Sequence, residues 1–312
     1  SEYKVLASYG HIRNLLPKSE GINTENFEMN FQLIDRNKKH IDAISKAVKS
    51  SDEILLATDP DREGEAIAWH IVEILNTKKL TKNKKIARII FGEITKGAIV
   101  DALKEPRDIS EALVHAQQAR QALDYLIGFN LSPLLWSKIR YGLSAGRVQS
   151  PALRLITERE KEIQIFEKKE YWSIHLDTQK ENSKFTTKLV ILENKKIEQF
   201  TVTNEAKQKE IVGELILKSA GKTKISRVDK KQRTRKPPSP FTTSTMQQEG
   251  VRKLGFTTKR TMIIAQQLYE GIKIGEGAVG LISYMRTDSM TLSKDAVNQA
   301  RDYLKNNYSP EF

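Results

Sequence analysis

The sequence predicts a multidomain protein that combines α/β and α+β architecture, and three observations support this prediction. A chain of 312 residues is too long for one small core and suits two or three domains. Its hydrophobic content of 38% is sufficient for packed cores. The spacing of apolar residues also changes along the chain, which divides it into the ranges 1–105, 106–165, 166–240 and 241–312.

In residues 1–105, short strands alternate with helices. A helical spacing of isoleucine and valine predicts a helix in KKHIDAISKAVKS, and DEILLATD is a short apolar run typical of a buried strand. A second amphipathic helix is predicted in EGEAIAWHIVEILN and a further buried strand in ARIIFGEIT. This alternation predicts a parallel sheet with helices on its faces.

Residues 106–165 have a helical pattern throughout. Three helices are predicted, in SEALVHAQQARQALDYLIGF, SPLLWSKI and SPALRLITEREKEIQIF. The third should begin with Ser150 as its N-cap, followed by Pro151 in the first helical position. A glycine-containing loop, YGLSAGRVQ, separates the second helix from the third.

In residues 166–240 the apolar residues recur at every second position. The segments YWSIHLDT, KFTTKLVIL and KIEQFTV are typical of strands in an antiparallel sheet. The basic, proline-containing stretch KKQRTRKPPSP then predicts a linker. Helices are predicted again in TMQQEGVRKLGF and TTKRTMIIAQQLYEG, before a strand in LISYMRTDS.

The formal charge of +13 is the most informative bulk property. Such a surplus favours a polyanionic partner, most commonly nucleic acid, although an AT-rich genome would also enrich lysine. The absence of cysteine excludes disulfides and thiolate zinc sites and agrees with a reducing cytoplasm. No apolar run reaches the roughly 18 residues of a membrane helix, so we expect a cytoplasmic protein with no membrane partner.

Three acidic residues, Asp59, Asp61 and Glu63, alternate between a predicted strand and a predicted helix. In an extended loop their carboxylates would point the same way, and clustered hard oxygen ligands suit Mg²⁺. An acidic first turn that complements the helix dipole would explain the same residues without a metal. The spacing alone leaves both interpretations open.

Tyr284 and Arg286 would share one face of a strand, with Met285 on the other. An unperturbed tyrosine, with a pKa of about 10, is almost entirely protonated at neutral pH. A nearby guanidinium favours the phenolate and can hold a phosphate oxygen, so this pair could perform nucleophilic attack on a phosphodiester. Without other evidence, a structural role for the pair is the more common outcome.

The loop between the predicted helices offers a second set of polar groups. Gly142 and Gly146 allow close approach of the backbone, and the following helix presents free N–H groups to a phosphate. Arg147 and Gln149 can add hydrogen bonds. In isolation, a tight turn between helices with solvent-facing arginines is the more common outcome.

Together these motifs resemble the bacterial type IA DNA topoisomerases. DPDREGEAIAWH is similar to the family's Toprim signature, YMRTDS to its active-site motif, and GHIRNL to an early loop near the DNA. The resemblance implies an N-terminally truncated Toprim domain in 1–105 and a helical DNA-groove domain in 106–165. It also implies a partial antiparallel β arch in 166–240 and a partial, helical winged-helix-like domain with the active-site tyrosine in 241–312.

The resemblance also implies the site residues. Tyr284 would be the nucleophile and Arg286 the phosphate-binding residue, while Asp59, Asp61 and Glu63 would bind Mg²⁺. The implied DNA contacts are His11, Arg120, Gln121, Asp124, Tyr125, Gly142, Ser144, Gly146, Arg147 and Gln149. Gln121 and Tyr125 stand where relatives have further basic residues, a departure from the family pattern.

A member of this family would cleave one strand of negatively supercoiled DNA through a 5′-phosphotyrosyl intermediate, pass another strand and religate without ATP. We expect a monomer that works in the bacterial cytoplasm on nucleoid DNA. The chain begins after the family's first strand and ends before its return through the arch, so this fragment alone should be weak or inactive. The alternatives are a Toprim-type nuclease or primase-like enzyme and a non-catalytic module that binds single-stranded DNA.

Overall fold

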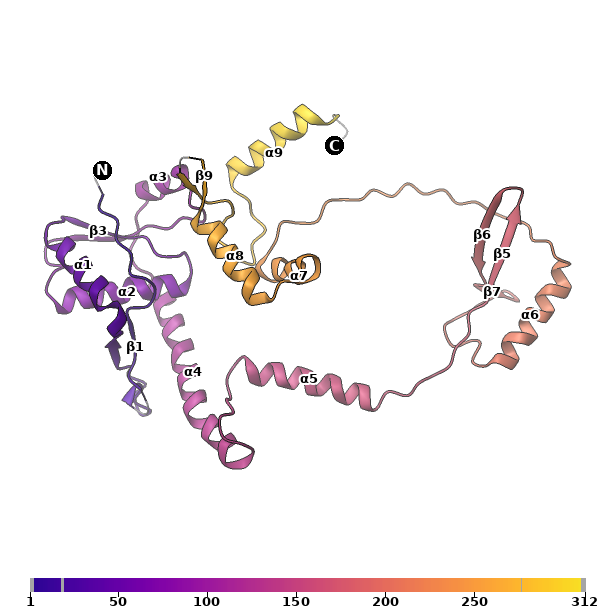
Figure 1. The fold of residues 1–312 in the computed structure, drawn as a ribbon, viewed down its shortest axis with the longest axis horizontal. Helices are drawn as coiled ribbons and strands as arrows, with labels where there is room; N and C mark the ends of the chain where they lie inside the picture. The colour runs from indigo at the N-terminus through magenta and orange to yellow at the C-terminus, as the bar shows by residue number, and fades with distance from the viewer. Residues whose placement is uncertain (1–2, 18–19, 276, 310–312) are drawn as a thin grey trace. The chain divides into compact units, whose positions relative to one another are not determined.

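The computed structural model describes residues 3–17, 20–275 and 277–309. The chain divides into two compact units, one formed by residues 1–150 and 237–312 and the other by residues 151–236 (Figure 1). The first unit thus joins the N-terminal part of the chain to its C-terminal part. The mixed α/β architecture agrees with the prediction.

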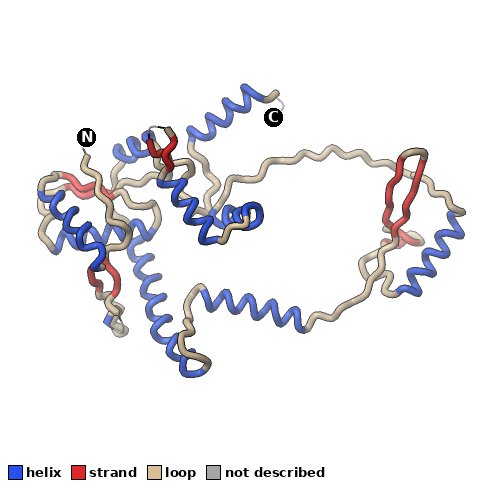
Figure 2. The backbone as a smooth tube through the Cα atoms, viewed as in Figure 1, coloured by secondary structure: helices blue, strands red, loops and turns tan. Residues whose placement is uncertain are grey.

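Up to residue 105, the described part of the first unit contains two strand pairs, one short 3₁₀ helix and three α-helices (Figure 2). Strands β1 (Arg13–Leu15) and β2 (Phe31–Leu33) form an antiparallel pair, whereas β3 (Glu53–Leu56) and β4 (Lys85–Arg88) pair in parallel. The chain between and after these strands forms η2 (Asp35–Asn37), α1 (Lys38–Lys49), α2 (Arg62–Thr77) and α3 (Lys96–Lys104). The predicted parallel pairing with helical crossovers is therefore present.

Apolar side chains at helical spacing form the core of this part. Ile41 and Val48 of α1 meet Leu56 of β3 and Ile71 and Ile74 of α2. Burial of such side chains contributes about 1.5–3 kcal/mol each to folding. This core fixes the C-terminal end of β3 against the start of α2, which is where the acidic loop lies.

Helix α4 (Glu111–Lys138) replaces two of the predicted helices with one. The prediction of a break before SPLLWSKI was wrong, because Pro133 lies inside the helix. Two hydrogen bonds close to this proline tie the end of α4 to the following loop. The Ser132 hydroxyl accepts from the Ala145 N–H at 3.2 Å, and the Trp136 indole donates to the Leu143 carbonyl at 2.6 Å.

The C-terminal part of the first unit begins with the predicted helices α7 (Thr243–Leu254) and α8 (Thr258–Glu270). An antiparallel pair, β9 (Ile272–Ile274) with β10 (Gly277–Val279), follows them, and α9 (Lys294–Asn307) ends the described chain. The prediction of a strand in LISYMRTDS was wrong, because residues 281–289 have no regular secondary structure. Both Tyr284 and Met285 are buried in this segment, so the two residues do not alternate between opposite faces.

Most of helix α5 (Gln149–Gln164) lies in the second unit, together with two hairpins and a further helix. The antiparallel pairs are β5 (His175–Lys180) with β6 (Ser183–Lys188), and β7 (Ile191–Leu192) with β8 (Lys195–Lys196). Helix α5 begins one residue before the predicted N-cap, Ser150. The period-two reading of 166–240 missed α6 (Glu205–Ser219), whose Asn204 N-cap is a sequence signal that could have revealed it.

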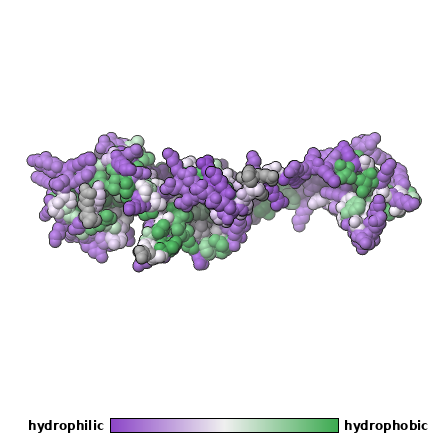
Figure 3. Space-filling view, turned by 90° about the horizontal axis from the view of Figure 1, so that it is seen from above, coloured by the Kyte–Doolittle hydropathy of each residue, from purple (hydrophilic) through white to green (hydrophobic). Residues whose placement is uncertain are grey.

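The surface agrees with the polar composition. Hydrophilic side chains cover most of the face seen in Figure 3, between separate hydrophobic patches. No helix among the described residues is long and apolar enough to cross a membrane.

Candidate active site

Tyr284 lies against the acidic loop, although 223 residues separate it from Asp61 in the chain. Its hydroxyl donates a hydrogen bond to Oδ2 of Asp61 at 2.7 Å, and its backbone N–H donates to the Gly92 carbonyl at 2.7 Å. The ring packs edge-on against Tyr269 of α8, with centroids 5.2 Å apart. These contacts hold the phenol at the C-terminal end of the β3–β4 pair.

The environment of Tyr284 favours the protonated phenol. Its side chain is buried, and burial raises its pKa, as do the hydrogen bond to Asp61 and the negative charges of Asp61 and Asp59. Arg286 lowers the pKa but is outweighed. The guanidinium, which lies 3.7 Å from Asp61, thus favours the phenolate as expected, but burial and the two carboxylates keep the phenol protonated in this conformation.

The acidic loop follows β3 and ends at the N-cap of α2. Oδ1 of Asp61 accepts from the Gly64 N–H at 2.9 Å, which satisfies one of the free donors of the helix. A side chain at Gly64 would place its Cβ 2.1 Å from the Asp59 carbonyl oxygen, so only glycine permits this tight return. Burial raises the pKa of Asp59, and the neighbouring charge of Asp61 raises it further.

A buried arginine donates hydrogen bonds to the backbone of the acidic loop. Arg88, the last residue of β4, donates to the carbonyl oxygens of Leu56, Thr58 and Asp59 at 2.9, 2.7 and 2.5 Å. Its Nε pairs with the buried carboxylate of Glu65 at 3.1 Å. Neither residue was predicted from the sequence, although an arginine in the apolar run ARIIFG is a signal, since a buried charge needs a partner.

Glu63 is paired with residues outside the acidic loop. Its carboxylate accepts from Gln117 at 3.2 Å and Arg120 at 3.0 Å on α4, and lies 3.3 Å from Nε2 of His11. Among the described residues, no group of three His, Cys, Asp or Glu side chains is arranged to hold a metal ion. Asp59 and Asp61 do form a close pair of carboxylates, and their mutual repulsion fits a divalent cation at this pair.

The predicted DNA contacts on α4 are held by other parts of the first unit. Gln121 donates to the Asn14 side chain at 3.1 Å. The Tyr125 hydroxyl donates to the Leu16 carbonyl at 2.9 Å and accepts from the Gly21 N–H at 3.2 Å. Asp124 pairs with Arg147 at 2.7 Å, which ties α4 to the glycine-containing loop.

Two glycines, Gly142 and Gly146, shape that loop. Gly142 has a φ of +87°, a conformation that L side chains rarely adopt. The Gln149 amide donates to the Ser144 hydroxyl at 3.1 Å and covers Gly146, where a Cβ would lie 2.7 Å from it. The structure thus brings Tyr284, Arg286, Asp59 and Asp61 together, and links His11, Glu63 and Arg120 in a second cluster.

Two known family models match most of this chain. Residues 1–94 match the model of the Toprim domain, and residues 108–312 match the model described as DNA topoisomerase. DNA topoisomerase 1 of Xylella fastidiosa strain Temecula1 is 55% identical over 98% of this chain and 38% of its own length. DNA topoisomerase 1 of Rickettsia felis is 49% identical over 100% of this chain and 40% of its own.

A solved structure agrees with these matches. Full-length topoisomerase I from Thermotoga maritima superposes on the whole of this chain with a TM-score of 0.78 and 38% identity, over 50% of its own chain. The chain spans about two fifths of the length of the curated relatives that it matches. On this evidence the chain belongs to the bacterial type IA DNA topoisomerase family, as its acidic and tyrosine motifs predict.

Proposed function

We propose that the protein containing this chain is an ATP-independent DNA topoisomerase that relaxes negatively supercoiled DNA through a covalent tyrosyl intermediate. The observation that carries this proposal is the hydrogen bond from Tyr284 to Asp61, which joins the tyrosine motif to the acidic motif. A nuclease or primase-like enzyme would need the acids alone. A single-strand-binding module would need neither.

The reaction is a transesterification. The Tyr284 oxygen attacks a phosphorus of single-stranded DNA, and the bond from phosphorus to the 3′-oxygen breaks as the bond to tyrosine forms. The 3′-oxygen leaves and takes a proton, and the reverse attack reseals the strand without ATP. Asp61, the acceptor of the Tyr284 hydrogen bond, is the group placed to receive the phenol proton.

Arg286 would hold the phosphate during this exchange. In the present geometry it lies 3.7 Å from Asp61, and more than half of its side chain is exposed, so it can turn to an incoming phosphate. A guanidinium that binds phosphate oxygens stabilises the charge that develops in the transition state. The paired contact with Asp61 keeps the guanidinium beside the phenol until DNA arrives.

Toprim domains typically bind a divalent metal, and we propose that the ion here is Mg²⁺. Asp59 and Asp61 would hold it, with Glu63 joining only after release from His11 and Arg120. When bound, such an ion neutralises the two carboxylates and positions a phosphate. The closeness of Asp59 to Asp61 supports these two residues as ligands more strongly than it supports Glu63.

The polar surface of α4 and its following loop would bind the single strand. Arg147 and Gln149 lie near the start of α5, where free N–H groups favour phosphate. Arg120 pairs with Glu63 at 3.0 Å, and about one third of its side chain is exposed. The residues proposed to contact DNA are His11, Arg120, Gln121, Asp124, Tyr125, Gly142, Ser144, Gly146, Arg147 and Gln149.

Covalent capture tests the proposal. The full-length protein is mixed with Mg²⁺ and a single-stranded oligonucleotide labelled at its 3′ end, because the tyrosyl link retains the downstream piece. Denaturation with detergent should leave label on wild-type protein and none on Tyr284→Phe. Tyr303→Phe, at an exposed position on α9, is the matched control and should retain the label. Label on Tyr284→Phe would contradict the proposal.

A further inference from the structure

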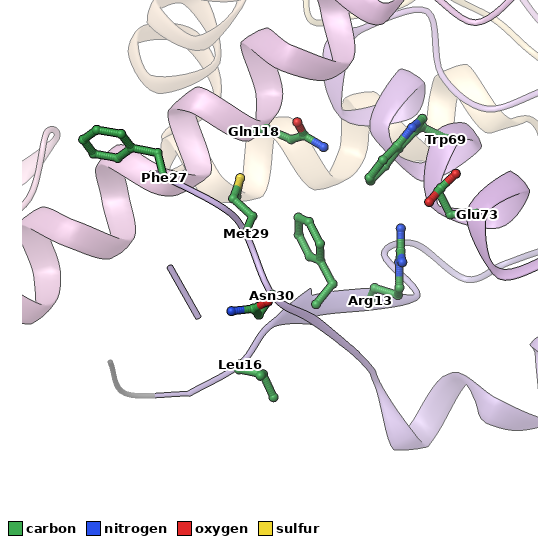
Figure 4. A pocket seen from close by; sticks show the side chains of 9 residues that line it. Arg13, Leu16, Phe27, Met29, Asn30, Trp69, Glu73 and Gln118 are labelled. Carbon is green, nitrogen blue, oxygen red and sulfur yellow. The ribbon is translucent and has the colours of Figure 1, made fainter. Parts of the chain in front are cut away.

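A pocket outside the candidate active site lies between the β1–β2 pair and helices α2 and α4. Its volume is about 530 Å³, within the usual range for small-molecule sites. Figure 4 shows Arg13, Trp69 and Glu73 at one end and Phe27 at the other, with Met29 and Asn30 between them. Its lining residues are Arg13, Leu16, Phe27, Met29, Asn30, Phe31, Trp69, Glu73 and Gln118.

Arg13 is the unusual member of this lining. Its guanidinium carbon lies over the rings of Phe31 and Trp69, 5.3 and 5.1 Å from their centroids. Its Nε donates to Nδ1 of the buried His70 at 2.9 Å. Its Nη2 is buried and has no hydrogen-bond partner among the described residues. A buried donor without a partner is costly, so the site favours a ligand that supplies an acceptor.

Phe27 lies at the other end of the pocket and has an uncommon backbone conformation. Its ring is 64% exposed, and its backbone φ is +59°, in the left-handed region that few residues other than glycine adopt. An exposed aromatic side chain held by an uncommon backbone conformation does little for folding. Together with Trp69 and Phe31 it offers flat apolar surfaces on which a planar ligand can stack.

The pocket is also continuous with the proposed DNA-binding surface. Gln118, in its lining, lies on α4 within one turn of Arg120 and Gln121. Gln121 in turn contacts Asn14 of β1, the neighbour of Arg13. A strand that follows α4 would therefore pass the mouth of the pocket.

We propose that this pocket receives one unstacked base of the single-stranded DNA, stacked on its aromatic walls and hydrogen-bonded by Arg13. The inference rests on the proposed function, since it presupposes that DNA follows α4. Planar bases carry ring nitrogens and carbonyl oxygens that a guanidinium can bind, and aromatic stacking accepts any base. The pocket would thus add a base contact remote from the cleaved phosphate.

Removal of the exposed aromatic ring of Phe27 tests whether the pocket binds a base. Phe27→Ala and Tyr303→Ala remove aromatic side chains of similar exposure, the second on α9 outside the pocket. Affinity of the full-length protein for an oligothymidylate and for an abasic oligonucleotide of equal length is measured by fluorescence anisotropy. Phe27→Ala should weaken binding of the oligothymidylate by about fivefold or more, as expected for one lost stacked base. Binding of the abasic strand should not change, and Tyr303→Ala should affect neither.

Equal losses on both strands, or no loss on either, would overturn the proposal. A pocket that instead holds a peptide segment of the protein would give a lower melting temperature for Phe27→Ala with unchanged DNA affinity, which also overturns it. Covalent capture by Tyr284 is scored in the same preparations. Capture that persists while the base dependence is absent refutes the pocket alone, whereas absent capture refutes the proposed function.

A second readout follows the pocket directly. In the full-length protein, the emission of Trp69 is obtained as the difference between wild type and a Trp69→Phe variant. Addition of the oligothymidylate should change the Trp69 emission, and the abasic strand should leave it unchanged. An equal change with both strands would contradict base stacking at this position.

Discussion

Asp61 is the residue at which the acidic loop and the tyrosine segment meet. One carboxylate oxygen caps α2 through the Gly64 N–H, and the other accepts the hydrogen bond of Tyr284. Arg286 lies 3.7 Å from the second oxygen. Because both oxygens are in use, a cation that binds Asp61 must compete with the phenol or share an oxygen with it.

Removal of the Asp61 charge should lower the pKa of Tyr284. Burial raises that pKa first, and the hydrogen bond and charge of Asp61 raise it further. In Asp61→Asn the amide still caps the helix, so the loop is kept while the negative charge is lost. The phenolate of Tyr284 should therefore form at lower pH than in wild type.

Ultraviolet difference titration at alkaline pH measures this change. Tyr284→Phe, made in both backgrounds, isolates the signal of Tyr284 from the other tyrosines. An identical Tyr284 midpoint in wild type and Asp61→Asn would mean that burial alone sets the pKa, and that the hydrogen bond to Asp61 contributes nothing.

Arg88 acts on the same loop without approaching the substrate. Burial opposes ionisation of Glu65, but hydrogen bonds from Arg107, the Ser110 N–H and Arg88 outweigh it and lower the Glu65 pKa. The ionised pair is therefore complete, and the other N–H groups of Arg88 donate to the carbonyl of Leu56 at the end of β3 and to those of Thr58 and Asp59 in the loop. Loss of one partner from such a buried pair typically costs about 3–5 kcal/mol.

At the scale of elements, the turn from β3 into α2 determines where the acids lie. Gly64→Ala should displace this turn, because its Cβ would meet the Asp59 carbonyl at 2.1 Å, a backbone atom that cannot swing aside. We expect lower stability and a loss of covalent capture, since Asp59 and Asp61 would both move. Denaturant unfolding and the capture assay measure the two effects.

Gly128→Ala is the matched control for that substitution. Gly128 lies within α4, and a Cβ there would meet nothing within 4 Å. Alanine in a helix interior is about 1 kcal/mol more favourable than glycine, so this variant should be slightly more stable and retain capture. A Gly64→Ala variant that behaved like Gly128→Ala would show that the turn tolerates a side chain.

The spacing of apolar residues predicted the helices and strands whose apolar residues all face a single hydrophobic core. Helices α1, α2, α7 and α8 lie where the spacing places them, and β3 and β4 form the expected parallel pair. The break predicted before SPLLWSKI is absent, since α4 continues through Pro133, and the hydrogen bonds of Ser132 and Trp136 with the following loop are tertiary contacts that no local pattern encodes. Helix α6 was missed because most of its residues are exposed and its apolar pattern is weak.

The candidate site was predictable in its residues but not in its contacts. The motifs name Asp59, Asp61 and Tyr284, and the structure places these three together. The turn of Glu63 toward His11 and Arg120 depends on where α4 packs, which no local pattern encodes. The same applies to Arg88, whose partners come from β3, its following loop and α2.

At the scale of the whole molecule, the surplus charge is concentrated in one segment. Residues 222–236 contain eight Lys and Arg and one Asp, and so carry seven of the thirteen surplus positive charges. The segment is exposed and has no regular secondary structure. An extended basic segment can follow a phosphate backbone without a fixed register, so it should contribute to affinity for DNA but not to sequence preference.

The salt dependence of DNA binding should therefore depend on this segment. Each phosphate contact with a single strand steepens the plot of log affinity against log salt by about 0.7. Replacement of five basic residues by glutamine should reduce the slope by up to about 3.5. The residues are Lys230, Lys231, Arg233, Arg235 and Lys236. The control replaces five exposed lysines of the β5–β8 hairpins, namely Lys180, Lys184, Lys188, Lys195 and Lys196. Equal slopes for the two variants would mean that total charge, and not this segment, attracts the DNA.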